Sequence, residues 1–122
     1  MANRSEQMQQ VLRALINNST DLEAAAVVSA DGLIIASMLP AGTDEDRISA
    51  MAAALLSLGE RTSHELARGE LEQMYVKGKN GYVMLMQAGN EAVLEAIAGP
   101  SAKLGMVLLE MKRAVQELAR IA

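Results

Sequence analysis

The apolar positions of this chain follow two spacings, one helical and one alternating. The N-terminal segment, residues 4–18, carries a helical stripe made of Met8, Val11, Leu12, Leu15 and Ile16. The C-terminal segment, residues 101–120, carries a second stripe made of Leu104, Leu108, Met111, Val115 and Leu118. We therefore predict an amphipathic helix at each end of the chain, the last one capped by Ser101.

A hairpin is predicted over residues 24–37, where two apolar runs flank Asp31-Gly32. This dipeptide favours a type I′ turn, in which both central residues need a positive φ. Neighbouring residues in each run are both apolar, so both faces of each strand are apolar. Strands of this kind are covered on both faces. We expect the hairpin to lie in the middle of a sheet between layers of helices.

A second helix is predicted over residues 43–68, with Thr43 as its cap, Asp46 reaching back and Gly69 ending it. It has more apolar surface than one sheet contact needs. The residues expected to face the sheet are Ile48, Met51, Ala52, Leu55, Gly59, Thr62 and Leu66. Ala50, Ala54 and Leu58 are then left over. Either another segment of the same chain covers them, or they form a dimer or partner surface.

Three strands are predicted in the following segment. Residues 70–77 alternate and are more polar, as expected for an edge strand. Residues 82–86 are apolar on both faces and belong inside the sheet, and residues 92–98 form the last strand. The order is α-β-β-α-β-β-β-α. It predicts an α+β sandwich with a five-stranded, mainly antiparallel sheet and helices on both faces, as one domain over residues 1–122.

Composition narrows the classes of function. The chain has 122 residues, a formal charge of −4, no cysteine and one histidine. It lacks the basic patch that nucleic-acid binding needs. It also lacks a signal-peptide core and an apolar run of about 20 residues that could span a membrane. We expect a cytoplasmic protein that binds no nucleic acid.

Catalytic chemistry is sparse. His64 lies beside Glu60 and Glu65, where a solvated histidine is the simpler interpretation, and no second histidine or cysteine completes a metal site. The serines have no base in a recognisable arrangement. Nine methionines with no phenylalanine or tryptophan indicate an adaptable core. We expect no catalytic, cofactor or metal site, and hence a binding protein rather than an enzyme.

Several segments together resemble the roadblock family, which includes dynein-associated light chains and bacterial or archaeal MglB-type regulators. The matching segments are residues 27–37, 48–55, 69–73, 104–105 and 110–114. The resemblance implies a fold similar to profilin and longin domains. It also implies a homodimer formed through the middle helix and the third strand, and binding to a small Ras-like GTPase, whose hydrolysis of GTP some members promote without an arginine finger.

Carried over to this chain, the resemblance implies two sets of residues. The GTPase-binding set is Arg47, Ala50, Met51, Ala54, Leu58 and Arg61. The homodimer set is Met51, Leu55, Leu58, Leu71, Gln73, Met74 and Tyr75. The two arginines could instead pair with acids of their own helix, namely Asp44, Glu60 or Glu65. A scaffold subunit of a larger complex and a small-molecule sensor are the alternative functions.

Overall fold

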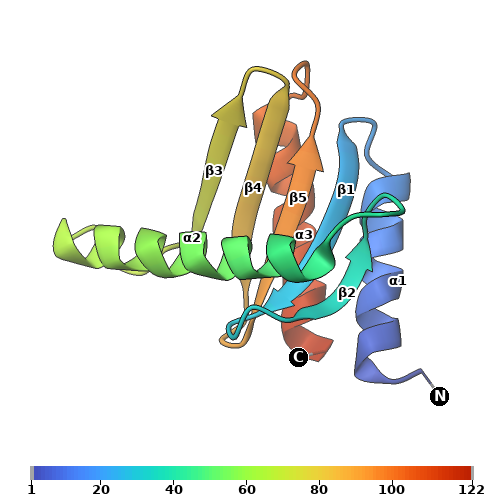
Figure 1. The fold of residues 1–122 in the computed structure, drawn as a ribbon, viewed down its shortest axis with the longest axis horizontal. Coiled ribbons are helices and arrows are strands. Elements are labelled where there is room, and N and C mark those ends of the chain that lie inside the picture. The colour runs from blue at the N-terminus through green and yellow to red at the C-terminus, as the bar shows by residue number, and fades with distance from the viewer. Residues whose placement is uncertain (1, 122) are drawn as a thin grey trace.

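The computed structural model describes residues 2–121, which form three helices and one five-stranded sheet (Figure 1). In chain order the elements are α1 (Arg4–Asn17), β1 (Leu22–Ser29), β2 (Ile34–Met38), α2 (Glu45–Glu65), β3 (Gln73–Gly78), β4 (Gly81–Ala88), β5 (Ala92–Ala98) and α3 (Leu104–Ile121). This is the predicted order, and the predicted fold class is confirmed. None of the helices within these residues combines the length and hydrophobicity that crossing a bilayer requires.

The sheet has the strand order β2-β1-β5-β4-β3, and every neighbouring pair is antiparallel. The predicted edge position of the third strand is confirmed. The prediction that the whole first hairpin lies in the middle of the sheet is wrong for β2, which forms the other edge. In place of another strand, side chains of α1 form hydrogen bonds with the backbone of this edge. Ser5 Oγ donates to the Ile35 carbonyl at 2.8 Å, and Gln9 Oε1 accepts from the Ser37 amide at 3.1 Å.

The turn between β1 and β2 is longer than predicted. It spans residues 30–33, and the Gly32 amide donates to the Ser29 carbonyl at 3.0 Å. Gly32 has the predicted positive φ, at 85°, but Asp31 does not share it, so the type I′ prediction is wrong. The β1–β2 register also shifts, because Val27 pairs with Ala36 and Val28 with Ile34. A four-residue loop followed by this bulge needs only one left-handed residue.

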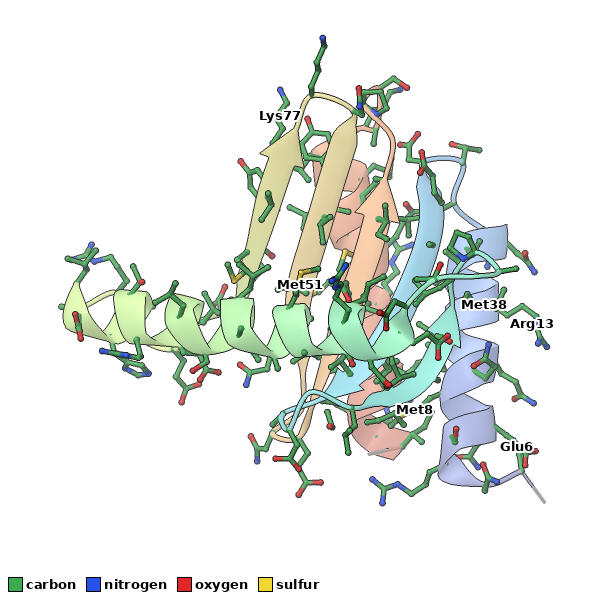
Figure 2. The ribbon with its side chains drawn as sticks, viewed as in Figure 1. Glu6, Met8, Arg13, Met38, Met51 and Lys77 are labelled. Carbon is green, nitrogen blue, oxygen red and sulfur yellow. The ribbon has the colours of Figure 1, made fainter. Side chains whose placement is uncertain are left out.

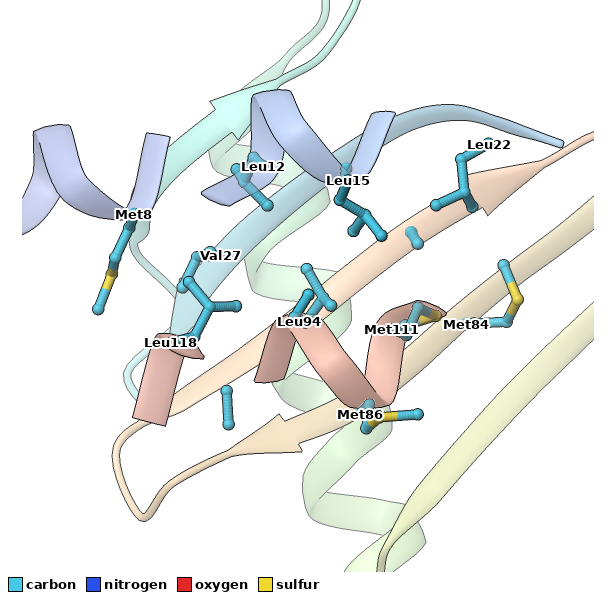
Figure 3. Close-up of a cluster of buried hydrophobic side chains, with 14 of the residues drawn as sticks. Met8, Leu12, Leu15, Leu22, Val27, Met84, Met86, Leu94, Met111 and Leu118 are labelled. Atoms are coloured by element: carbon cyan, nitrogen blue, oxygen red, sulfur yellow. The ribbon is translucent and has the colours of Figure 1, made fainter. Parts of the chain in front are cut away.

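Two apolar cores lie on the two faces of the sheet. The larger one fills the space between the sheet and α1 with α3, where Met8, Leu12, Leu94, Met111 and Leu118 are almost fully buried (Figure 3). The smaller one lies under α2 and contains Ala26, Val28, Ala52, Leu56, Leu85 and Val93. The predicted cover on both faces is therefore present, but it is thinner on the α2 face.

Three helix ends differ from the predictions. Asp44, not Thr43, caps α2, and its carboxylate accepts from the Arg47 amide at 3.2 Å. Thr43 donates its hydroxyl to the Pro40 carbonyl instead. The helix ends at Glu65, three residues early, because Ala67 already has a left-handed φ of 57°. α3 starts at Leu104 and so begins too late for Ser101 to be its cap.

Candidate functional site

The helix α2 lies across the sheet and its C-terminal part projects beyond β3 (Figure 1). Gly59 marks the crossing, because a Cβ there would lie 2.9 Å from Met74 Sδ and 3.1 Å from Leu71 Cδ2. The residues that α2 buries most deeply are Ser49, Ala52 and Leu56, all in its first twelve positions. The last turns of the helix therefore have no sheet of their own chain beneath them.

The side of α2 that faces away from the sheet is an apolar surface flanked by two arginines. We call it the outer face of α2, and it consists of Arg47, Ala50, Met51, Ala54, Leu58 and Arg61. All six side chains are exposed, and 53% of Met51 and 61% of Leu58 is accessible to solvent. The structure thus brings the predicted GTPase-binding set together on one side of a helix. Figure 2 labels Met51 on this helix, in front of the sheet.

Three of the sheet-facing assignments made for the second predicted helix were wrong. Met51 was expected to pack on the sheet, but the buried side follows Ser49, Ala52 and Leu56, about one residue out of phase. Leu66 is 65% exposed and Thr62 is exposed as well. Both lie beyond the Gly59 crossing, where the sheet has already ended.

The two arginines of the outer face differ in their partners. Arg61 forms an ion pair with Glu65 at 3.8 Å, and both side chains are more than 70% exposed. Pairs this exposed contribute little to stability, and a partner protein can compete for the arginine. No ion pair within residues 2–121 involves Arg47. The alternative in which acids of α2 neutralise both arginines is therefore realised for Arg61 alone.

An open apolar groove of about 400 Å³ lies under the projecting end of α2. We call it the α2–β3 groove, and it is lined by Leu55, Leu58, Gly59, Thr62, Ser63, Leu66, Arg68, Leu71 and Met74. Four residues of the predicted dimer set belong to it: Leu55, Leu58, Leu71 and Met74. Gln73 and Tyr75 do not, because the register pairs them with Met86 and Met84, which face α1 and α3.

Glu95 is a buried carboxyl group in the middle of the sheet. It pairs with Ala26 on β1 and with Leu85 on β4, and all three residues face α2. Only 6% of the residue is exposed, and its Oε1 has no hydrogen-bond partner within residues 2–121. Burial raises the pKa of this carboxyl from 4.5 to about 7. Glu95 was not predicted as a site residue, although it is the single charged residue in the apolar run 92–98.

His64 lies on the other flank of α2, in a shallow polar pocket with Glu60, Glu70 and Asn90. Its side chain is exposed. Within residues 2–121, no three histidine, cysteine, aspartate or glutamate side chains gather closely enough to hold a metal ion. Gln87 Nε2 donates to Glu60 Oε1 at 3.3 Å, which ties this part of α2 to β4.

The chain is similar to known proteins in both sequence and fold. The family model described as Roadblock/LC7 domain matches residues 8–98. Two uncharacterised proteins of Methanocaldococcus jannaschii are each 35% identical over 103 residues, which cover 84% of this chain and 90% of each relative.

Among solved structures, the gliding protein MglB of Thermus thermophilus has a similar fold, with a TM-score of 0.88 and 22% identity. The match covers 100% of this chain and 93% of that one. Profilin IA of Acanthamoeba castellanii is similar at a TM-score of 0.66 and 13% identity, over 92% of this chain and 96% of that one. The expected similarity to profilin is therefore confirmed.

Proposed function

The chain belongs to the Roadblock/LC7 domain family, and from this premise we propose that it is a homodimeric regulator that binds a small Ras-like GTPase. The observation that carries the proposal is the outer face of α2. It presents an apolar strip with an arginine at each end, on a helix that projects past the edge of its own sheet. In this role the chain acts by binding and catalyses no reaction itself.

Edge pairing supports the homodimer. β3 leaves one side of its backbone unpaired, and such an edge is a template for another strand. Two β3 edges related by a twofold axis form an isologous, closed contact and one continuous sheet across two protomers. Val76 lies in this strand, on the α2 face, and is 47% exposed.

The projecting end of α2 fits the same dimer. The twofold axis beside β3 carries the projecting turns over the partner's sheet, where the α2 face is otherwise thinly covered. Leu58 and Leu66 are each more than 60% exposed in one chain, and both line the α2–β3 groove. Large exposed apolar patches of this kind mark interaction sites. The groove therefore gains its cover from a second copy of the chain.

The outer face of α2 supports GTPase docking. Arg47 and Arg61 lie about four helical turns apart, so they share one side of the helix with Ala54 and Leu58 between them. An apolar strip with positive ends complements an acidic, partly apolar segment on a partner, such as a switch region. Rim charges of this kind set the association rate and the specificity of a complex.

A charge reversal tests the docking surface. We expect Arg47→Glu with Arg61→Glu to weaken binding to the GTP-loaded partner at least tenfold, about 1.4 kcal/mol, and to leave the dimer and its Tm nearly unchanged. The partner is first isolated from the native cell extract in the presence of GTP or GDP analogues. Titration calorimetry then measures the affinity, and light scattering checks the dimer.

The matched control reverses two exposed arginines on α1, Arg4→Glu with Arg13→Glu, on the other face of the sheet. It makes the same change in net charge and should leave the affinity within about twofold of the wild type. Equal affinities for the α2 double variant and the wild type would place the docking surface elsewhere and favour a scaffold role.

A further inference from the structure

The sheet face opposite α2 is left uncovered at β3. By register, Gln73, Tyr75 and Lys77 point to this face, opposite Met86, Met84 and Tyr82. α3 lies behind β4 and β5 and α1 lies at the β1–β2 side, so neither helix reaches β3 (Figure 1). Tyr75 is 50% exposed and meets Tyr82 edge to face, with 6.2 Å between the ring centroids. β3 thus presents an aromatic, partly solvent-exposed surface on the face of the sheet opposite α2.

The flank of α3 beside this surface is apolar with a basic side chain. Glu110, Arg113 and Glu117 line the groove towards α1. Helical geometry places Leu108, Lys112 and Val115 on the opposite flank, towards β3. Leu108 and Val115 are only half buried, and Leu109, on the outward side of the helix, is 45% exposed. The acidic residues of α3 therefore face away from β3.

The charge of this surface is positive although the whole chain carries −4. Lys77 Nζ lies 5.8 Å from the centre of the Tyr82 ring, at the end of β3 remote from α2 (Figure 2). The single ion pair among residues 2–121, Arg61–Glu65, lies on the other side of the sheet. Lys77 and Lys112 are therefore free to meet acidic groups of another molecule.

In the homodimer, the β3 surface and the α3 flank of one protomer join those of its partner to form one trough. This step rests on the proposed function. Pairing of two β3 edges joins their Tyr75 faces into a floor, with α3 of each protomer as a wall. α3 packs on β4 and β5, so its axis lies about one and a half strand spacings, roughly 7 Å, from β3. The two α3 axes then stand about 20 Å apart, which is about two helix-packing distances and leaves room for one more helix between them.

We propose that this trough binds one amphipathic helix of a partner protein per dimer. The apolar stripe of that helix lies on the paired Tyr75 rings and against Leu108, and its acidic flanks meet Lys77 and Lys112. The surface is distinct from the outer face of α2, on the other side of the sheet. The dimer can thus hold a GTPase on one face and a helix of a second protein on the other.

The test uses a synthetic peptide of about 18 residues, long enough to span about 27 Å as a helix. It carries a leucine stripe at helical spacing, glutamates on both flanks and a fluorescent label. Anisotropy measures its affinity and stoichiometry, and light scattering measures the mass of the protein in the same samples. We expect one peptide per dimer. We also expect Lys112→Glu to weaken binding at least tenfold, about 1.4 kcal/mol.

Two matched controls distinguish binding at this site from non-specific binding. Arg113→Glu changes the neighbouring side chain, on the α1 flank of the same helix, and should alter the affinity less than about twofold. A peptide with lysines in place of the glutamates should not bind.

The outcomes are distinguishable. A dimer that binds no acidic peptide, binds two per dimer, or ignores Lys112→Glu overturns the trough and leaves the proposed function standing. Equal binding of the lysine peptide does the same. A monomer overturns both proposals, since one wall of the trough and the second α2 then have no source.

Discussion

Replacing Glu95 with glutamine is expected to stabilise the protein at pH 8 by about 2 kcal/mol and to change it little at pH 5. Glu95 is the buried carboxyl on β5, and its Oε1 has no partner within residues 2–121. Ionised carboxylates in such surroundings lose hydration without compensation. A neutral amide of the same shape avoids this cost.

The sign follows from the raised pKa. Burial raises the pKa of Glu95 from 4.5 to about 7 in the folded chain, so the folded state binds more protons than the unfolded state between these values. Wild-type stability therefore falls as the pH rises from about 4.5 to about 7. The full shift corresponds to about 3 kcal/mol, which residual solvent screening reduces to about 2 kcal/mol.

Urea unfolding at a series of pH values, at one protein concentration, measures this difference. The control variant is Glu91→Gln, an exposed glutamate in the turn that precedes β5, and its stability should run parallel to the wild type. Parallel curves for Glu95→Gln and the wild type would show that Glu95 finds a partner or water in solution.

Replacing Leu58 with glutamate is expected to convert the dimer into a monomer, with a dissociation constant raised about 100-fold, or about 2.8 kcal/mol. Leu58 is 61% exposed in the single chain but lies in both the outer face of α2 and the α2–β3 groove. In the proposed dimer the twofold axis repeats the change, so two carboxylates enter one apolar contact. The fold of each protomer should survive, because a single chain exposes this side chain.

Leu33→Glu is the matched control, because Leu33 is 64% exposed at the tip of the first hairpin, which lies beside the first turns of α2 and away from the α2–β3 groove. Sedimentation equilibrium gives the dissociation constants, and circular dichroism confirms that both variants are folded. If Leu58→Glu and Leu33→Glu dimerise equally well, the interface lies away from the projecting part of α2.

The sequence was sufficient for the element order, because helices and strands differ in the period of their apolar positions. The polar alternation of residues 70–77 also identified β3 as an edge. The hairpin prediction failed at β2 because a strand that is apolar on both faces needs cover on both faces, which an edge strand can also have. Ile35 packs against the larger core and Ile34 against the smaller one. Side chains of α1 form hydrogen bonds with the backbone of this edge.

The site was predictable in part. Surplus apolar surface on the second helix indicated a contact face, and the structure gathers its residues on one side. Which side faces the sheet could not be read from residues 48–58, because they are apolar almost all round, and Met51 was placed wrongly for that reason. The burial of Glu95 and the uncovered face of β3 opposite α2 depend on strand order and register, which link residues far apart in the chain.

The homodimer is the claim on which GTPase docking and the helix-binding trough both depend. Light scattering of the wild-type chain across a dilution series measures the mass of the particle and so tests for this dimer. We expect a particle of twice the chain mass of 13.0 kDa that persists down to about 1 μM. A stable particle of 13.0 kDa at that concentration would contradict it.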